Sequence, residues 1–77
     1  MNNVKYPVLI IRRKESKLSQ ETVAKKIGVT RVAYSLKEVG KHPFTIDEAK
    51  ILSELFRMSI ENLMFGSLES FLMEETK

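Results

Sequence analysis

A turn of about three residues around Gly28 separates two short helical patterns, and it constrains the fold more than any other feature of this sequence. Gly28 can adopt a positive φ as the chain leaves the first pattern. Ala24 is small where the two helices cross closely, and Val29 is the apolar turn residue that faces the core. Tyr34 is the inward residue of the second pattern. The stretch 19–40 therefore predicts a helix-turn-helix.

Helical spacing of apolar residues continues along the rest of the chain, and no segment alternates over the length that a strand requires. Proline is tolerated in the first turn of a helix, and Ser and Thr cap helix starts. Such start signals stand at Pro7, Ser19, Thr30, Thr45 and Ser59. We therefore expect five helices, over residues 7–17, 20–27, 31–39, 46–56 and 59–66. The predicted fold class is all-α, in a single domain over residues 1–77.

The same spacing predicts the inward faces of these helices. The expected core residues are Val8 and Ile11, with Leu9 if the register differs by one, then Val23, Ala24, Ile27, Ala49, Leu52 and Phe56. The fifth helix contains the apolar residues Ile60, Leu63 and Met64. Beyond Gly66, Leu68, Phe71 and Leu72 stand at i, i+3 and i+4, which indicates one or two more turns of helix. The tail 67–77 is expected either to take part in dimerisation or to be disordered.

Length and composition exclude several classes of protein. A chain of 77 residues is too short to bury two cores. It has no cysteine and one histidine, which excludes a disulfide framework and a thiolate or all-imidazole metal site. No catalytic triad, phosphate loop or paired acid site is present, so we expect no enzyme activity, no metal and no cofactor. The longest apolar run, residues 8–11, is far below the roughly 18 residues of a membrane helix, and we expect a cytoplasmic protein.

Charge is unevenly distributed along the chain. Residues 1–41 carry ten basic and three acidic side chains, a net charge of +7. Residues 42–77 carry three basic and seven acidic ones, a net charge of −4. A domain with one basic half is expected to present a positive face to a polyanion, of which DNA is the commonest.

Several motif residues fall in register with a known family without a gap. They are Leu18-Ser19-Gln20-Glu21, Ala24, Ile27-Gly28-Val29-Thr30-Arg31, Glu38 and the later stretch Met58-Ser59-Ile60-Glu61-Asn62-Leu63. Over about residues 9–65 the chain resembles the five-helix, lambda-repressor-like DNA-binding domain of phage repressors, Cro proteins and related bacterial regulators. The resemblance implies a sequence-specific transcriptional regulator in a bacterial cell or phage-infected host. It also implies a third helix in the major groove of a palindromic operator, bound by a homodimer at least on DNA.

The resemblance also implies roles for individual residues. The expected base contacts are Arg31, Val32, Ser35 and Leu36, and the expected phosphate contacts are Ser19, Gln20, Lys41 and His42. Arg31 is suited to guanine, because a guanidinium pairs bidentately with the O6 and N7 acceptors. Val32 and Leu36 are suited only to apolar edges such as a thymine methyl. Arg13 and Glu38 match an internal ion pair between the first and third helices of the family.

Other readings of these residues remain open. The outward apolar residues Val32 and Leu36 are also explained by a neighbouring subunit or by a third helix that is rolled about its axis. A helical protein–protein interaction module, such as an antirepressor or antitoxin, is the alternative function. Candidates for a dimer interface are Met64, Phe65, Leu68, Phe71 and Leu72. The alternative is that they complete the protein's own core, which suits Met64 and Leu68 at least equally well. We expect no membrane partner and infer no small-molecule effector.

The chain departs from the family pattern at a few positions. Lys37 stands where an inward apolar residue is usual, so either its stem lies along the core with the ammonium at the edge, or the third helix is rolled. Arg12 stands where the first helix normally buries a leucine-like residue. Arg57 replaces a common glycine after the fourth helix. Phe44 replaces the usual loop proline, which indicates a loop that packs inward and compensates for Lys37.

Overall fold

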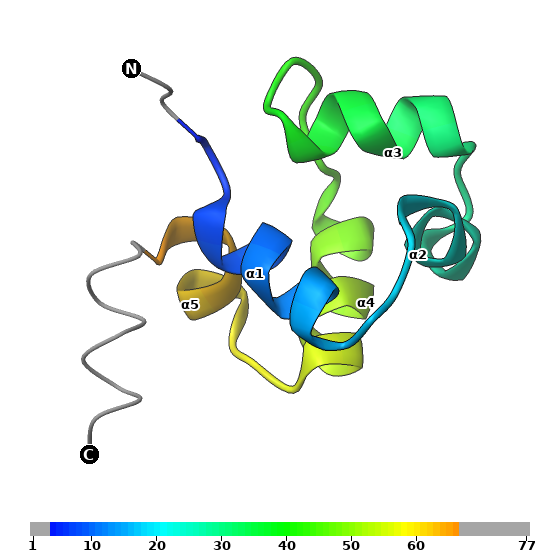
Figure 1. Cartoon of the computed structure of the whole chain (residues 1–77). Coiled ribbons are helices and arrows are strands. Elements are labelled where there is room, and N and C mark those ends of the chain that lie inside the picture. Colours follow the sequence, from blue (N-terminus) through cyan, green and yellow to red (C-terminus); the bar gives the residue numbers. More distant parts are fainter. Residues whose placement is uncertain (1–3, 67–77) are drawn as a thin grey trace.

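A computed structural model of the chain describes residues 4–66, which form five α-helices and no strand within that range (Figure 1). The helices are α1 (Pro7–Glu15), α2 (Gln20–Ile27), α3 (Arg31–Glu38), α4 (Ile46–Phe56) and α5 (Ile60–Phe65). The predicted all-α class is therefore confirmed. The first helix ends two residues earlier than expected, because Lys17 has a left-handed backbone with φ 58°. The predicted turn with Leu68, Phe71 and Leu72 lies outside the described residues.

The predicted capping residues begin four of the five helices. The side-chain oxygens of Ser19, Thr30, Thr45 and Ser59 each accept a hydrogen bond from a backbone N–H in the first turn. Thr45 and Glu48 form a complete capping box, in which the Glu48 carboxylate also accepts the Thr45 backbone N–H at 3.0 Å. These bonds satisfy backbone donors that a helix start leaves without partners, so they fix where each helix begins.

Apolar side chains from all five helices meet in one core. The most deeply buried are Tyr34, Leu9, Leu52, Leu63, Val8 and Val23. In α1, Leu9 is fully buried and Ile11 is only partly buried. The helix therefore has the alternative register, in which Leu9 faces the core. The half-buried Arg12 instead donates from Nε to the Met58 sulfur at 3.3 Å. Tyr34 faces the core as predicted, so α3 is not rolled.

The helices are arranged so that α3 lies at one edge of the molecule (Figure 1). It packs mainly against α2, while α4 contacts α2 and α5, and α5 contacts α1. The turn between α2 and α3 contains Gly28, whose φ is 81° as predicted. At the far end of α4, Arg57 adopts a left-handed φ of 57°. None of the helices in residues 4–66 has the length and hydropathy to span a membrane.

Candidate nucleic-acid interface

The outer side of α3 carries the four residues predicted to contact bases. Arg31, the first residue of the helix, is exposed, and 63% of Val32 is accessible to solvent. Ser35 and Leu36, one turn later, are half-buried. Residues at positions i, i+1, i+4 and i+5 share one face of a helix, so the structure brings the four side chains together.

One further exposed residue on this side of α3 was not predicted. Val39, at the end of α3, is 54% exposed. Together with Val32 and Leu36 it has the spacing i, i+4, i+7 and forms an apolar strip along the helix. The outward positions of Val32 and Leu36 were predicted from the sequence, whereas the exposure of Val39 is seen only in the structure.

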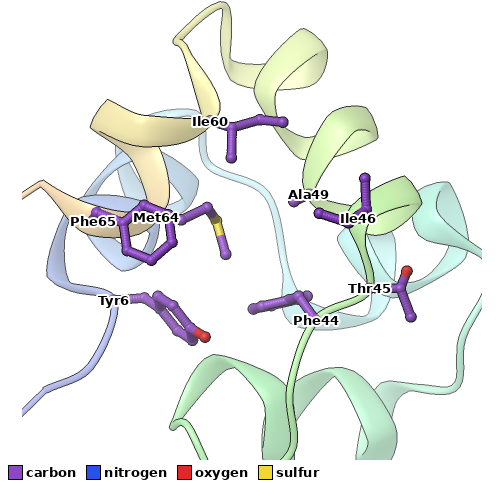
Figure 2. A pocket seen from close by; sticks show the side chains of 8 residues that line it. All are labelled: Tyr6, Phe44, Thr45, Ile46, Ala49, Ile60, Met64 and Phe65. Carbon is purple, nitrogen blue, oxygen red and sulfur yellow. The ribbon is translucent and has the colours of Figure 1, made fainter.

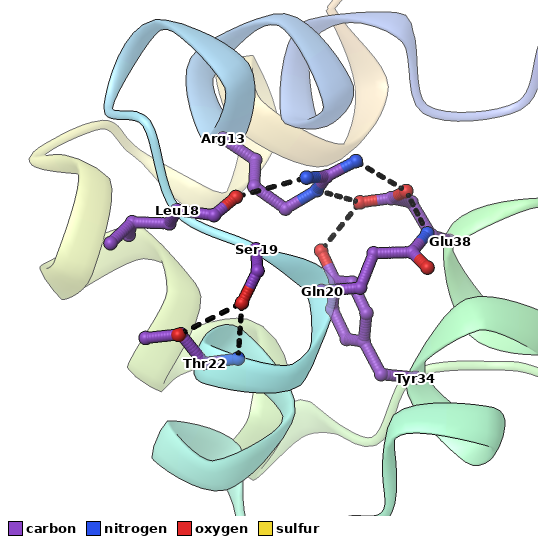
Figure 3. A network of polar contacts seen from close by, with 7 residues as sticks. All are labelled: Arg13, Leu18, Ser19, Gln20, Thr22, Tyr34 and Glu38. Carbon is purple, nitrogen blue, oxygen red and sulfur yellow. Dashed lines mark hydrogen bonds and ion pairs between the residues drawn. The ribbon is translucent and has the colours of Figure 1, made fainter.

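The inner side of α3 is held by a buried polar network centred on Glu38 (Figure 3). Arg13 of α1 donates to the two Glu38 carboxylate oxygens at 2.7 and 3.2 Å, which confirms the ion pair implied by the resemblance. Tyr34 donates its hydroxyl to the same carboxylate at 2.7 Å, and Gln20 of α2 donates its amide at 2.8 Å. The remaining Arg13 nitrogen donates to the Leu18 carbonyl at 3.0 Å. Three helices are therefore joined through one carboxylate.

These contacts keep Glu38 ionised. Burial alone raises the pKa of a carboxyl group, but hydrogen bonds from Arg13, Gln20 and Tyr34 outweigh it, and the pKa of Glu38 is lowered. The hydrogen bond to Glu38 raises the pKa of Arg13, and burial followed by the bond to Glu38 raises the pKa of Tyr34. The network is thus a carboxylate with three matched donors and leaves no buried charge without a partner.

A second ion pair joins the end of α3 to the start of α4. Lys37 donates from Nζ to a Glu48 carboxylate oxygen at 2.7 Å, and both side chains are mostly buried. The ammonium also lies 6.0 Å from the centre of the Phe44 ring. Phe44 packs edge-on against Tyr6 with ring centres 5.4 Å apart. The loop that contains Phe44 therefore packs inward, as predicted. Lys37 therefore takes the first of its two expected arrangements, with the stem against the core and the charge at the edge.

The two predicted phosphate-contact residues at the start of α2 already have intramolecular partners. Ser19 is exposed, and its hydroxyl accepts the Thr22 backbone N–H at 3.1 Å. Gln20 is half-buried and uses its side-chain amide to brace Glu38. The amide keeps a second N–H, since the group carries two donors.

The other two predicted phosphate-contact residues lie in the loop after α3. Lys41 and His42 have exposed side chains, and both backbone N–H groups donate to the Leu36 carbonyl, at 2.9 and 3.3 Å. Gly40 has a φ of 88°, which turns the chain sharply at this point. The loop is therefore fixed by its backbone while its side chains are free to contact a partner.

The site is a short helix anchored on its inner side, open on its outer side, and followed by the exposed cation Lys41. A major groove admits one α-helix of this kind, so fold and site define a helix-turn-helix DNA-binding domain. The chain belongs to the helix-turn-helix family, whose family model matches residues 9–63, and it has the lambda-repressor-like fold of that family. Members of the family are DNA-binding transcription regulators. A search of curated proteins found no match to the chain.

Proposed function

We propose that this protein is a small repressor of phage or prophage type that binds a palindromic operator with α3 in the major groove. The observation that carries this proposal is the division of α3 into an anchored and an open side. Glu38 is 3% exposed and holds four hydrogen bonds, whereas Val32 is 63% exposed. A helix held in this way presents its outer residues in a fixed register, which base reading requires.

Individual residues have separate roles in the proposed complex. Arg31 reads guanine, while Val32 and Leu36 contact thymine methyl groups and Ser35 contacts a neighbouring base edge. Ser19, Gln20, Lys41 and His42 contact phosphates and so fix the register of α3 without reading sequence. The Gln20 amide would bridge Glu38 and a phosphate, which links the inner network directly to the DNA backbone.

The proposed operator complex contains two copies of the chain, because one recognition helix reads only a few base pairs. Two copies would bind half-sites about 34–36 Å apart. Of the predicted interface residues, Met64 is buried in the protein's own core, whereas Phe65 is 78% exposed. Phe65 and Ile46, which is 77% exposed, border an apolar cavity of about 140 Å³ (Figure 2). We propose this surface as part of the dimer contact. The domain would extend over residues 1–77.

Selection of bound duplexes from a random pool, repeated at two salt concentrations, tests the proposal. A palindromic consensus would support both base reading and two-fold assembly. Affinity should fall steeply as salt rises, because each phosphate contact releases counterions. A pool that yields no enriched sequence at either salt concentration would contradict the proposal.

The alternative function is a helical protein–protein interaction module, and the apolar strip of Val32, Leu36 and Val39 favours it. Exposed apolar residues on one helix face are typical of a protein contact. Binding through such a strip would depend weakly on salt, whereas DNA binding would depend on it strongly. The salt series therefore separates the two functions.

A further inference from the structure

Lys5, in the segment that precedes α1, lies directly against the loop that follows α3. A Cβ atom placed on Gly40 would come within 2.9 Å of the Lys5 Cδ and 3.0 Å of the Lys5 Cβ. The aliphatic stem of Lys5 therefore covers the Gly40 backbone at a distance that only glycine allows. Two segments 35 positions apart in the sequence meet at this point.

The charged end of Lys5 is available to a partner. The residue is exposed, and its Nζ lies 5.6 Å from the centre of the Tyr6 ring. None of the ion pairs between residues 4 and 66 involves Lys5. A cation without a carboxylate partner is available to attract an anion outside the chain.

Lys5 thereby lies beside Lys41, the cation of the loop after α3. Gly40 is followed directly by Lys41 and His42, both exposed, and the loop is fixed by the bonds of their backbone amides to the Leu36 carbonyl. The contact with Gly40 places Lys5 next to this loop. The two cations at the end of α3, Lys5 and Lys41, therefore come from two chain segments.

We infer that Lys5 is a phosphate-contacting residue that binds the DNA backbone beside Lys41. The inference rests on the proposed function, since it adds a contact to the same surface. It also goes beyond the family match, because Lys5 precedes the matched residues 9–63. The contact would position α3 without reading bases.

The test uses the full chain and a short duplex of mixed sequence, so that no operator needs to be known. Binding is measured by fluorescence anisotropy over a series of salt concentrations. Lys5→Met keeps the aliphatic stem on Gly40 and removes the charge. Its slope of log affinity against log salt should be shallower than that of the unmodified chain by about 0.9 for each bound copy, the value for one phosphate.

Two further variants isolate the position of the charge. Arg57→Gln also removes one cation, from the end of α4 that lies away from α3 (Figure 1), and it should leave the slope unchanged. Lys5→Arg keeps the charge and should retain the unmodified slope, which separates a charge effect from a loss of folding.

Each outcome supports or overturns the inference. If the unmodified chain binds with a steep slope and Lys5→Met has the same slope, the inference is wrong while the proposed function stands. Equal slope changes in Lys5→Met and Arg57→Gln would also overturn it, because they would reflect net charge alone. If the unmodified chain ignores the duplex even at low salt, both the inference and the proposed function fail.

Discussion

The inner and outer sides of α3 sort their side chains in opposite ways. Glu38, a charged residue, is almost fully buried, whereas Val32 and Val39 are more than half exposed. Charged residues are rarely buried unless they are paired, and exposed apolar residues on a short helix need a partner. Polar bonds on the inner side therefore orient α3, and the outer side is free for contact.

The largest loss of stability is expected from a substitution that breaks the polar network on the inner side of α3. Glu38→Ala leaves the Arg13 guanidinium buried without its partner, and it also removes the acceptor of the Tyr34 and Gln20 bonds. Removal of one partner from a buried pair costs about 3–5 kcal/mol of stability. Urea unfolding followed by circular dichroism measures the loss.

The matched control for Glu38→Ala is Glu15→Gln. Glu15 pairs with Arg12 at 3.3 Å on the surface of α1, where an ion pair contributes about 0–1 kcal/mol. Similar losses in the two variants would show that the inner network does not hold α3.

A smaller loss is expected from the second ion pair. Lys37→Met preserves an apolar stem near Phe44 and removes the bond to Glu48, which keeps its bond from the Thr45 backbone. A hydrogen bond to a charged group contributes about 1.5–3 kcal/mol. The change in free energy of unfolding, measured with urea, should therefore lie below that of Glu38→Ala. A stabilised Lys37→Met variant would contradict this reading.

The outer side is tested by a change in DNA preference at constant stability. Arg31→Ala should reduce discrimination between related duplexes by about 1–3 kcal/mol, because a bidentate base contact is lost. Lys41→Ala should weaken binding to all duplexes about equally. Competition binding against a panel of single-base variants measures both. Equal losses from the two substitutions would remove Arg31 from the base-reading set.

The smallest change in the free energy of unfolding is expected from moderate acidification. The folded-state pKa of Glu38 and of Glu48 is lowered, in each case because hydrogen bonds outweigh burial. Their stabilisation is therefore complete above the unfolded pKa of about 4.3 and is lost as pH falls through the folded values. The free energy of unfolding should be flat near neutrality and decline only below about pH 4–5. In Glu38→Ala this decline should be shallower. An equally steep decline would show that Glu38 does not contribute to the loss of stability in acid.

Local signals in the sequence predicted most of the fold. Ser19, Thr30, Thr45 and Ser59 fixed the helix starts, because a cap involves only a side chain and backbone within the same turn. Gly28 marked a helix end for an equally local reason, since the chain adopts a positive φ there. The helix at residues 7–17 was too long by two residues, because nothing in the sequence indicates a left-handed Lys17.

The residues of the candidate site also divide into those that local signals predicted and those that they did not. The outward positions of Arg31 and Val32 follow from helical spacing once Tyr34 is placed inward. Periodicity left two arrangements for Lys37, and the choice depended on Glu48, eleven residues later on another helix. The exposure of Val39 and the burial of Met64 likewise depend on what packs beside them.

The sequence by itself determined the class of fold, the helix starts and the basic half of the chain, because caps, turn residues and charge act over a few neighbouring positions. Only the tertiary structure decided that Glu38 collects bonds from three helices, that Lys37 reaches Glu48 and that Lys5 covers Gly40. Each of these contacts joins residues whose distance is set by the packing of whole helices. Their orientation depends on the shape of the shared core, which no local pattern encodes.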